Sequence, residues 1–332
     1  MPSIITRGAM SARGFGFGYK ASGGLKVQDV FAVNTWTGSG TPFSVTNGIN
    51  LSANGGLVWV KKRSAIQDHV LADTARGATS ELNTNATAAA QVAGSGYDIG
   101  SFNSNGYSIG GFWNYNLNSS GDNYVGWSFR KATKFFDVVT GTTDSSGNIT
   151  INHGLGVTPG MVFVKAVNLT QDWFVYHASV GNNAYLRLNA TSAQASFSGA
   201  FSATSTTFTA NGNSTNSLYV YYLFAHDPDT TNGIIQCGSM AAGTTSVTLG
   251  WQPQYILFKA SGSPGGSWWI VDTTRGWDAA NDITLLANSA IAEPGYSNSY
   301  NFQPTSTGFT FNLDSWDGAK DYIYMCIRKG PM

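Results

Sequence analysis

Short apolar runs, bounded by Gly, Ser, Thr, Asn or Pro, recur along the whole chain. Runs of this length between turn-forming residues are typical of β-strands rather than of helices. Three of them are apolar throughout and end in a lysine, at residues 57–61, 161–165 and 255–259. Strands without a polar face belong in the middle of a sheet that is covered on both sides. The pattern therefore predicts an all-β protein in which these three strands are central.

The same order of landmarks surrounds each predicted central strand. A glycine-rich strand pair precedes it. A second strand, an asparagine behind a leucine-bearing run, a strand pair behind a phenylalanine and a closing aromatic strand follow it. The asparagines are Asn85, Asn189 and Asn288, and the closing strands begin at Tyr124, Tyr219 and Tyr322. Self-similarity of this kind is the sequence signature of a repeat architecture.

The repeats divide the chain into a short N-terminal arm, residues 1–27, and three parts: 28–132, 133–229 and 230–332. Each repeat has about 100 residues, which is too long for one coil of a solenoid and is the usual size of a β-sandwich. We therefore expect three tandem, separate β-sandwiches. The alternative is one closed assembly with three-fold pseudosymmetry. Helix is expected only as a short helix or turn at 83–92 and 278–292.

Composition narrows the class of protein. The 332 residues contain 18 Lys and Arg against 18 Asp and Glu, and a nucleic-acid partner would require clustered basic residues. A hydrophobic fraction of 42% argues against a disordered chain. No apolar run is long enough for a membrane helix, so we expect no membrane insertion. The two cysteines, Cys237 and Cys326, are too few for disulfide bonds to stabilise a chain of this length, which indicates synthesis in a reducing cytoplasm.

An Asp-x-x-Arg-Gly pattern occurs twice, at 73–77 and 272–276. We interpret both as structural turns, in which an Asp–Arg pair closes the turn and the glycine takes a positive φ. The residues of these turns are Asp73, Arg76, Gly77, Asp272, Arg275 and Gly276. A carboxylate and a guanidinium in a functional site are the alternative. The middle repeat has neither charge and carries His177 to Gly181 there.

Candidate catalytic and metal-binding residues are few, and we expect no catalytic residue, metal or cofactor. The four histidines, His69, His153, His177 and His226, have no recognisable nucleophile or zinc motif beside them. We expect them to be ordinary surface or turn residues. Asp314, Asp317 and Asp321 cluster around a glycine, as calcium ligands do, but without EF-hand spacing, which favours a solvated hairpin.

Aromatic residues near predicted loops are the candidates for ligand binding. Exposed rings beside Asn and Asp meet the physical requirement for sugar binding, because a ring covers apolar C–H groups while polar side chains pair with hydroxyls. The candidates are Trp113, Tyr115, Trp277, Tyr296 and Trp316. Packing in the core is the alternative for each of them. In the arm, the glycine-rich segment 14–18 lacks the lysine of a phosphate loop, and we interpret Arg13, Phe15 and Phe17 as virion-attachment residues of a flexible anchor.

Several segments are similar to known phage sequences. Residues 11–16 resemble the opening of many phage fibre proteins. A domain repeated in virion proteins of marine and freshwater tailed phages, including cyanophage-like ones, is similar to segments spread over most of 28–330. These segments are 58–63, 73–77, 81–85, 101–107, 124–131 and 154–160. The resemblance is strongest in the first repeat and weakest in the second.

The resemblance implies a virion surface or tail component and carries no catalytic residues. The expected function is therefore a non-enzymatic tail fibre or tail-associated adhesin, located in the virion. Its expected partners are other virion proteins and a host cell-surface glycan or protein receptor, and the resemblance suggests a homotrimer. A capsid decoration protein on the phage head is the alternative. A glycan depolymerase is a second alternative, which would require two carboxylates about 5–10 Å apart.

Overall fold

The computed structural model describes residues 24–92, 98–110, 117–278, 283–293, 302–311 and 320–330. Almost all regular structure in these ranges is β-strand, which confirms the predicted all-β class. The helical elements are the 3₁₀ turn η1 (Val27–Asp29) and the one-turn helix α1 (Leu51–Asn54). Residues 83–92 and the described part of 278–292 hold turns, short strands and extended backbone, and the short helices considered there are not seen.

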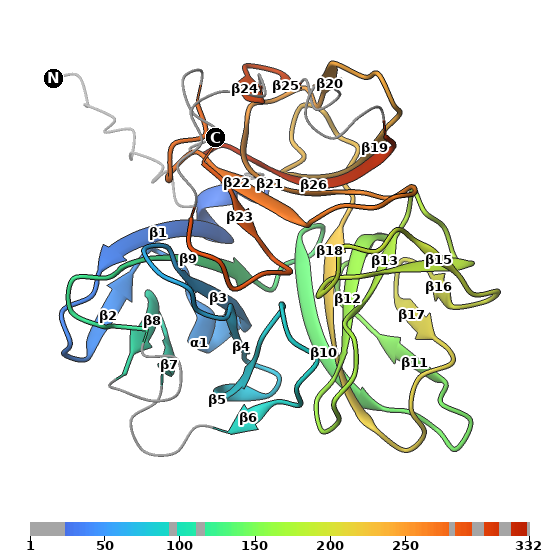
Figure 1. The fold of residues 1–332 in the computed structure, drawn as a ribbon, viewed down its shortest axis with the longest axis horizontal. Coiled ribbons are helices and arrows are strands. Elements are labelled where there is room, and N and C mark those ends of the chain that lie inside the picture. The colour runs from blue at the N-terminus through green and yellow to red at the C-terminus, as the bar shows by residue number, and fades with distance from the viewer. Residues whose placement is uncertain are drawn as a thin grey trace, which may run out of the picture.

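The first sandwich, blue to green in Figure 1, packs a six-stranded antiparallel sheet against a three-stranded one. Tyr107 and Ile109 of the small sheet contact Val58 and Val60 of the large sheet in one hydrophobic cluster. The large sheet has the order β1 (Phe31–Thr37), β9 (Asn123–Arg130), β3 (Gly56–Lys62), β4 (Val70–Asp73), β5 (Gly77–Leu82), β6 (Gln91–Val92). The small sheet has the order β2 (Phe43–Thr46), β8 (Gly106–Ile109), β7 (Ile99–Asn103).

The second sandwich, green to yellow in Figure 1, repeats this strand order. Its large sheet has the order β10 (Phe136–Thr142), β18 (Leu218–Ala225), β12 (Pro159–Ala166), β13 (Phe174–His177), β14 (Ala184–Arg187), β15 (Ala195–Ser196). Its small sheet has the order β11 (Ile149–Asn152), β17 (Thr207–Ala210), β16 (Phe201–Ala203).

The third sandwich, orange to red, has the same order with five strands in its large sheet. That sheet runs β19 (Ile235–Met240), β26 (Tyr322–Arg328), β21 (Pro253–Ala260), β22 (Trp269–Asp272), β23 (Leu285–Leu286). The small sheet runs β20 (Ser246–Thr248), β25 (Gly308–Thr310), β24 (Gln303–Thr305). In all three large sheets the apolar strand that ends in lysine lies between a closing aromatic strand and a short second strand, as a buried central strand should.

The three sandwiches surround a common centre and share a hydrophobic core (Figure 1). The ring of Phe129, from the first sandwich, lies 5.6 Å from Phe224 of the second and 6.0 Å from Tyr255 of the third, between ring centroids. The expectation of separate sandwiches is therefore wrong in this respect, because each one buries part of its apolar surface against the other two. The closed arrangement that was the alternative describes the molecule.

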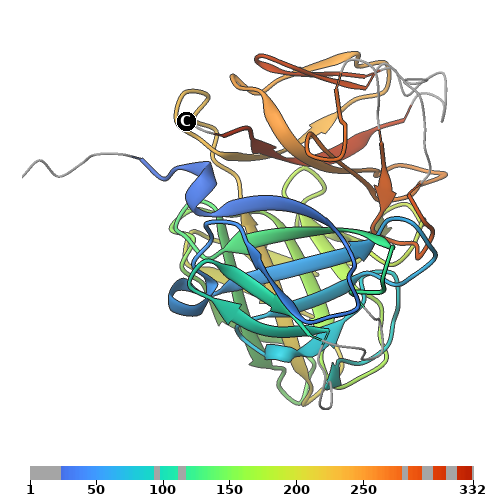
Figure 2. The ribbon, with the colours of Figure 1, turned by 90° about the vertical axis from the view of Figure 1, so that its left-hand side faces the viewer.

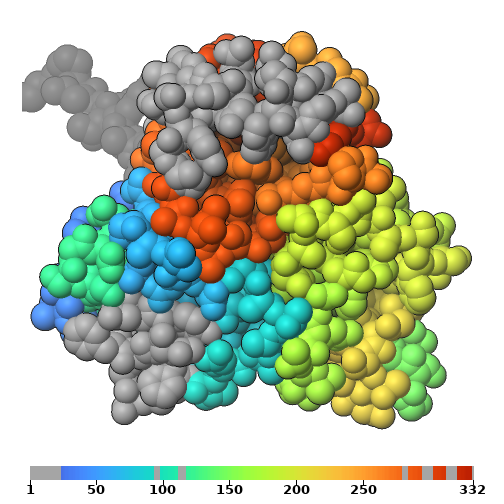
Figure 3. Space-filling model, in the orientation of Figure 1, coloured from blue at the N-terminus to red at the C-terminus, as the bar shows by residue number. Residues whose placement is uncertain are grey.

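Backbone hydrogen bonds close the three sandwiches into a ring. The loop after each landmark asparagine crosses to the neighbouring sandwich. Ala90 N donates to Val167 O at 2.7 Å, Gln194 N to Ser261 O at 2.9 Å, and Glu293 N to Arg63 O at 2.8 Å. The contacts therefore run from first to second, second to third, and third to first. These crossing points are called the junctions below, and Figure 3 shows the sandwiches meeting at the centre of the junction face.

The lysine at the end of each central strand contributes to one junction. Lys61 Nζ donates to Ala290 O at 3.2 Å, Lys165 Nζ to Thr87 O at 2.9 Å, and Lys259 Nζ to Ala190 O at 3.2 Å. All three lysines are fully buried. Burial lowers the pKa of Lys61 and of Lys165 to about 8, since it removes water from the ammonium group.

The landmark asparagines hold the second strand of each sheet in place. Their side-chain oxygens accept hydrogen bonds from backbone N–H groups: Asn85 from His69 at 3.0 Å, Asn189 from Trp173 at 2.9 Å, and Asn288 from Trp268 at 2.7 Å. In the second sandwich the Asn189 amide also donates to Asp172 Oδ1 at 2.8 Å. A single side chain thus satisfies a backbone donor and orients a carboxylate.

Both described ends of the chain lie on the side opposite the junction face, as Figure 2 shows. Val27 is fully buried in the shared core, and a Cβ atom at Gly330 would lie 2.8 Å from Val27 Cγ1. The first described residues are therefore fixed to the body of the protein.

Replacing Asn189 by Ala should lower the free energy of unfolding by about 1–3 kcal/mol, because the buried Trp173 N–H loses its acceptor. Urea denaturation monitored by tryptophan fluorescence measures the loss. Asn182→Ala, at an exposed asparagine of the same sandwich, is the matched control and should change stability by no more than about 0.5 kcal/mol. Equal effects of the two variants would contradict the role assigned to Asn189.

Candidate functional site

The first Asp-x-x-Arg-Gly segment forms a tight turn between β4 and β5. Asp73 Oδ1 accepts hydrogen bonds from Ala75 N at 3.0 Å and Arg76 N at 2.9 Å. The Arg76 guanidinium pairs with Asp73 Oδ2 at 2.7 Å. Gly77 has a φ of 95°, which favours glycine. Both charges are buried by this arrangement, and neither faces solvent.

This turn also connects the first sandwich to the second. Tyr222 of β18 donates from its hydroxyl to Asp73 Oδ2 at 2.7 Å and accepts from Arg76 Nη2 at 3.0 Å. Burial raises the pKa of Tyr222 well above its ordinary value, so the phenol stays protonated and keeps donating. The Asp–Arg pair is thus a contact between sandwiches as well as a turn.

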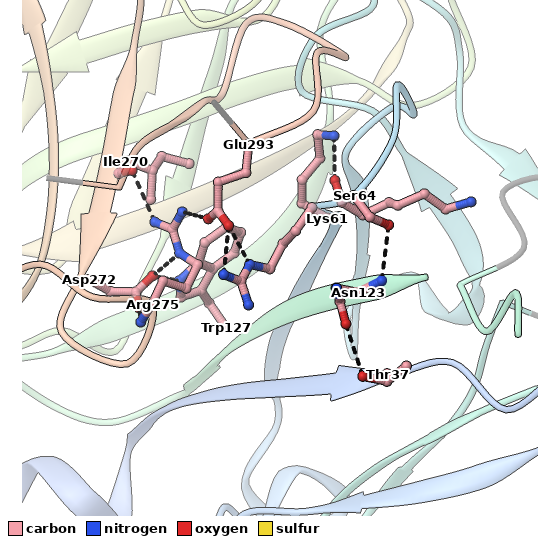
Figure 4. A network of polar contacts seen from close by, with 11 residues as sticks. Thr37, Lys61, Ser64, Asn123, Trp127, Ile270, Asp272, Arg275 and Glu293 are labelled. Carbon is pink, nitrogen blue, oxygen red and sulfur yellow. Dashed lines mark hydrogen bonds and ion pairs between the residues drawn. The ribbon is translucent and has the colours of Figure 1, made fainter. Parts of the chain in front are cut away.

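The second Asp-x-x-Arg-Gly segment is the centre of a larger network, which Figure 4 shows. Arg275 Nε contacts Asp272 Oδ2 at 2.6 Å, and its Nη1 contacts Glu293 Oε1 at 2.7 Å. Glu293 also pairs with Arg63 of the first sandwich at 2.6 Å. Trp127 of β9 donates from Nε1 to Asp272 Oδ2 at 3.0 Å. Burial opposes the charge of Arg275, but the two carboxylates raise its pKa above the usual value, so the cation persists.

A neutral histidine takes the same position in the second sandwich. His177 Nε2 lies 3.2 Å from Tyr324 O of the third sandwich, and its Nδ1 accepts from Ser179 N at 3.1 Å. Burial lowers the pKa of His177 to about 4. The corresponding turns of the three sandwiches therefore contact the next sandwich in the same cyclic direction, two through ion pairs and one through an imidazole.

His69 makes a similar buried contact. Its Nδ1 accepts from Trp59 Nε1 at 2.9 Å, and its Nε2 lies 2.9 Å from Leu286 O of the third sandwich. The expectation of a surface position is wrong for His69 and His177, which are fully buried, although His177 does begin a turn. The sequence could not distinguish them, because both owe their burial to a neighbouring sandwich.

The predicted ligand-binding rings do not form a site among the described residues. Trp277 is 1% exposed, packs 5.0 Å from Phe302 between ring centroids, and donates from Nε1 to Phe302 O at 2.9 Å. Its assignment as an exposed ring is therefore wrong, because the core alternative applies. Trp113, Tyr115, Tyr296 and Trp316 lie outside the described residues, as do Asp314, Asp317 and the arm residues Arg13, Phe15 and Phe17.

An aromatic pocket that sequence reasoning missed lies on the second sandwich. It has a volume of about 250 Å³. The residues that line this aromatic pocket are Phe174, Tyr185, Phe197, Ala200, Phe201, Asn211, Gly212 and Asn213. They combine rings with amides, as expected for a receptor site, but they come from distant parts of the second repeat. The available signal was an Asn-Gly turn beside a phenylalanine-rich strand pair.

Local geometry keeps the pocket open. Gly212 has a φ of 72°, and a Cβ atom there would lie 2.6 Å from Phe197 Cζ. The position of the Phe197 side chain therefore requires glycine at residue 212. Phe197 remains 43% exposed. Tyr185 packs edge-on against Phe174 at 5.2 Å, and Arg187 lies over the Tyr185 ring at 5.1 Å. The side-chain nitrogen of Asn213 is buried without a hydrogen-bond partner.

Residues 26–331 match the DUF7483 family, a domain of unknown function, and the chain belongs to that family. No curated protein matches the chain. Among the described residues, no helix has the length and apolar character needed to cross a membrane.

The Asp272–Arg275 pair should be strongly coupled. Asp272→Asn or Arg275→Met alone should each cost about 3–5 kcal/mol of unfolding free energy, because each leaves a buried charge without its partner. The double variant should cost clearly less than the sum, and chemical denaturation of the four proteins measures the difference. Lys134→Met, which removes an exposed ion-pair partner, should cost about 1 kcal/mol or less. Additive costs for the buried pair would contradict the coupling.

Acid should weaken the junction between the second and third sandwiches. The unfolded His177 binds a proton near pH 6.5 and the folded one only near pH 4, so stability falls as the pH decreases between these values. His177→Gln, which preserves a donor and an acceptor, should remove on the order of 2–3 kcal/mol of this fall. Urea denaturation at several pH values from 7 to 4.5 measures the fall in stability of both proteins. His226→Gln, at a half-buried histidine, should change the dependence of stability on pH less than His177→Gln does. An unchanged pH profile for His177→Gln would refute the assignment.

Proposed function

We propose that the protein is a non-enzymatic component of a tailed-phage virion that binds the host surface, as a tail fibre or tail-associated adhesin. The aromatic pocket of the second sandwich is the observation that carries the binding role, since it joins rings and amides in an accessible hollow. The resemblance of segments such as 58–63 and 73–77 to a repeated virion domain supports the virion assignment.

The use of charged residues supports a binding role over catalysis. The charges of Asp73 and Asp272 are paired with an arginine of the same turn. The same two carboxylates accept hydrogen bonds from a tyrosine and a tryptophan of the next sandwich. Burial, and then the neighbouring Asp98, raise the pKa of the Glu81 carboxyl group to about 8. A raised pKa is typical of a carboxyl group that acts as a general acid. Yet Glu81 is 1% exposed and Asp98 is fully buried, so neither is accessible to a polysaccharide.

A decoration protein on the phage head is the second candidate. The ring of three similar sandwiches favours it, because such a body suits a position of three-fold symmetry on a capsid lattice. This candidate shares the virion location and the attachment through the chain before residue 24, but assigns the partner surface to the capsid.

Immunogold labelling of purified phage particles separates the two candidates. Antibodies against the purified protein should decorate the tail or baseplate if the protein is an adhesin, and the head if it is a decoration protein. Mass spectrometry of the same particles should detect the chain after high-salt washing. Absence from washed particles would refute both virion roles.

A further inference from the structure

We infer that the aromatic pocket of the second sandwich binds a neutral sugar ring, an uncharged pyranose of a host surface glycan. This rests on the proposed adhesin role and adds to it a ligand class and the residues that recognise the ligand. No cofactor or metal is needed for such a contact.

The size of the pocket fits one ring. Its volume of about 250 Å³ falls below the roughly 300–1,000 Å³ of sites for drug-sized ligands. A single pyranose fills a space of this order, and the remainder of a longer glycan would extend into solvent. The affinity for one ring should then be in the millimolar range, since a small ligand gains little binding free energy.

The apolar part of the lining suits the C–H face of a sugar. Phe197 is 43% exposed and rests against Gly212, and Phe201 and Tyr185 form neighbouring walls. A large ring that stays partly exposed has apolar surface to bury against a ligand. In the first sandwich the residue at the position of Phe174 is the fully buried Val70, which pairs in the same way with the central strand.

The polar part of the lining suits a ligand with hydrogen-bonding groups. Asn211 and Asn213 bring amide groups to this lining. Sugar hydroxyls can donate to an amide oxygen and accept from an amide nitrogen. The Tyr185 hydroxyl accepts from Arg187 Nη2 at 3.1 Å, so its own proton remains able to donate. An apolar peptide side chain would offer this phenol no acceptor.

The charge of the lining selects a neutral sugar. None of the eight lining residues is an acid or a basic residue. The guanidinium of Arg187, which lies over the Tyr185 ring, is paired with Asp172 through Nε and Oδ2 at 2.7 Å. A carboxylate, sulfate or phosphate on the ligand would therefore be partly desolvated without a counter-charge.

Saturation-transfer NMR on the full chain tests the inference directly. The probes are the methyl glycosides of glucose, galactose, mannose and N-acetylglucosamine, with methyl glucuronide and N-acetylneuraminic acid as charged probes. At least one neutral glycoside should give transfer at its ring C–H protons. Phe197→Ala should weaken binding about tenfold, and Tyr185→Phe by a smaller factor. Ile66→Ala, at a residue that is 77% exposed outside the pocket, is the matched control and should bind like the unaltered protein.

Three results would overturn the inference: no transfer to any neutral glycoside, binding confined to the charged probes, or binding unchanged in Phe197→Ala. Its failure is distinguishable from that of the proposed function. A protein that labels the phage tail but binds no neutral sugar refutes the pocket assignment alone. A protein that binds neutral sugar through Phe197 but is absent from particles refutes the virion role alone.

Discussion

A buried lysine ammonium needs hydrogen-bond acceptors, and in each sandwich some of them lie on a different sandwich. Lys61, Lys165 and Lys259 end the three central strands inside the protein and reach carbonyls of the loops that cross over from a neighbour. Without the neighbour, each ammonium would lose a partner and each crossing loop its backbone hydrogen bonds. Because each central strand ends in a buried lysine that needs a neighbour's carbonyl, the three sandwiches must close into a ring.

The other polar contacts follow the same cyclic direction. The turn after the second strand of each large sheet contacts a closing strand of the next sandwich, through Asp73, His177 or Asp272. The chemistry differs between the three, but the geometry is shared. This explains how the second repeat could lose both charges of the Asp-x-x-Arg-Gly pattern: a neutral imidazole with one donor and one acceptor satisfies the same position. The side chains at the junctions are used in contacts between sandwiches. A ligand would therefore bind at the outer surface of a sandwich.

Much of the fold followed from the sequence, because the signals were local. Fully apolar strands at 57–61, 161–165 and 255–259 predicted buried central strands, and the recurrent turns predicted an all-β chain. The closure of the ring, the burial of His69 and the place of Trp277 depend on contacts between residues far apart in sequence, which periodicity does not encode. The aromatic pocket was missed for the same reason: Phe174, Tyr185 and Phe197 belong to separate segments that only the sheet brings together.

Calorimetry of the intact protein tests most directly the claim that the three sandwiches form one unit. The shared core and the cyclic junctions predict a single unfolding transition in which the calorimetric and van't Hoff enthalpies agree. They also predict that residues 133–229 alone do not fold, because their junction partners and part of their core are missing. Two or three resolved transitions, or a stable isolated second sandwich with the melting temperature of the whole protein, would contradict this account.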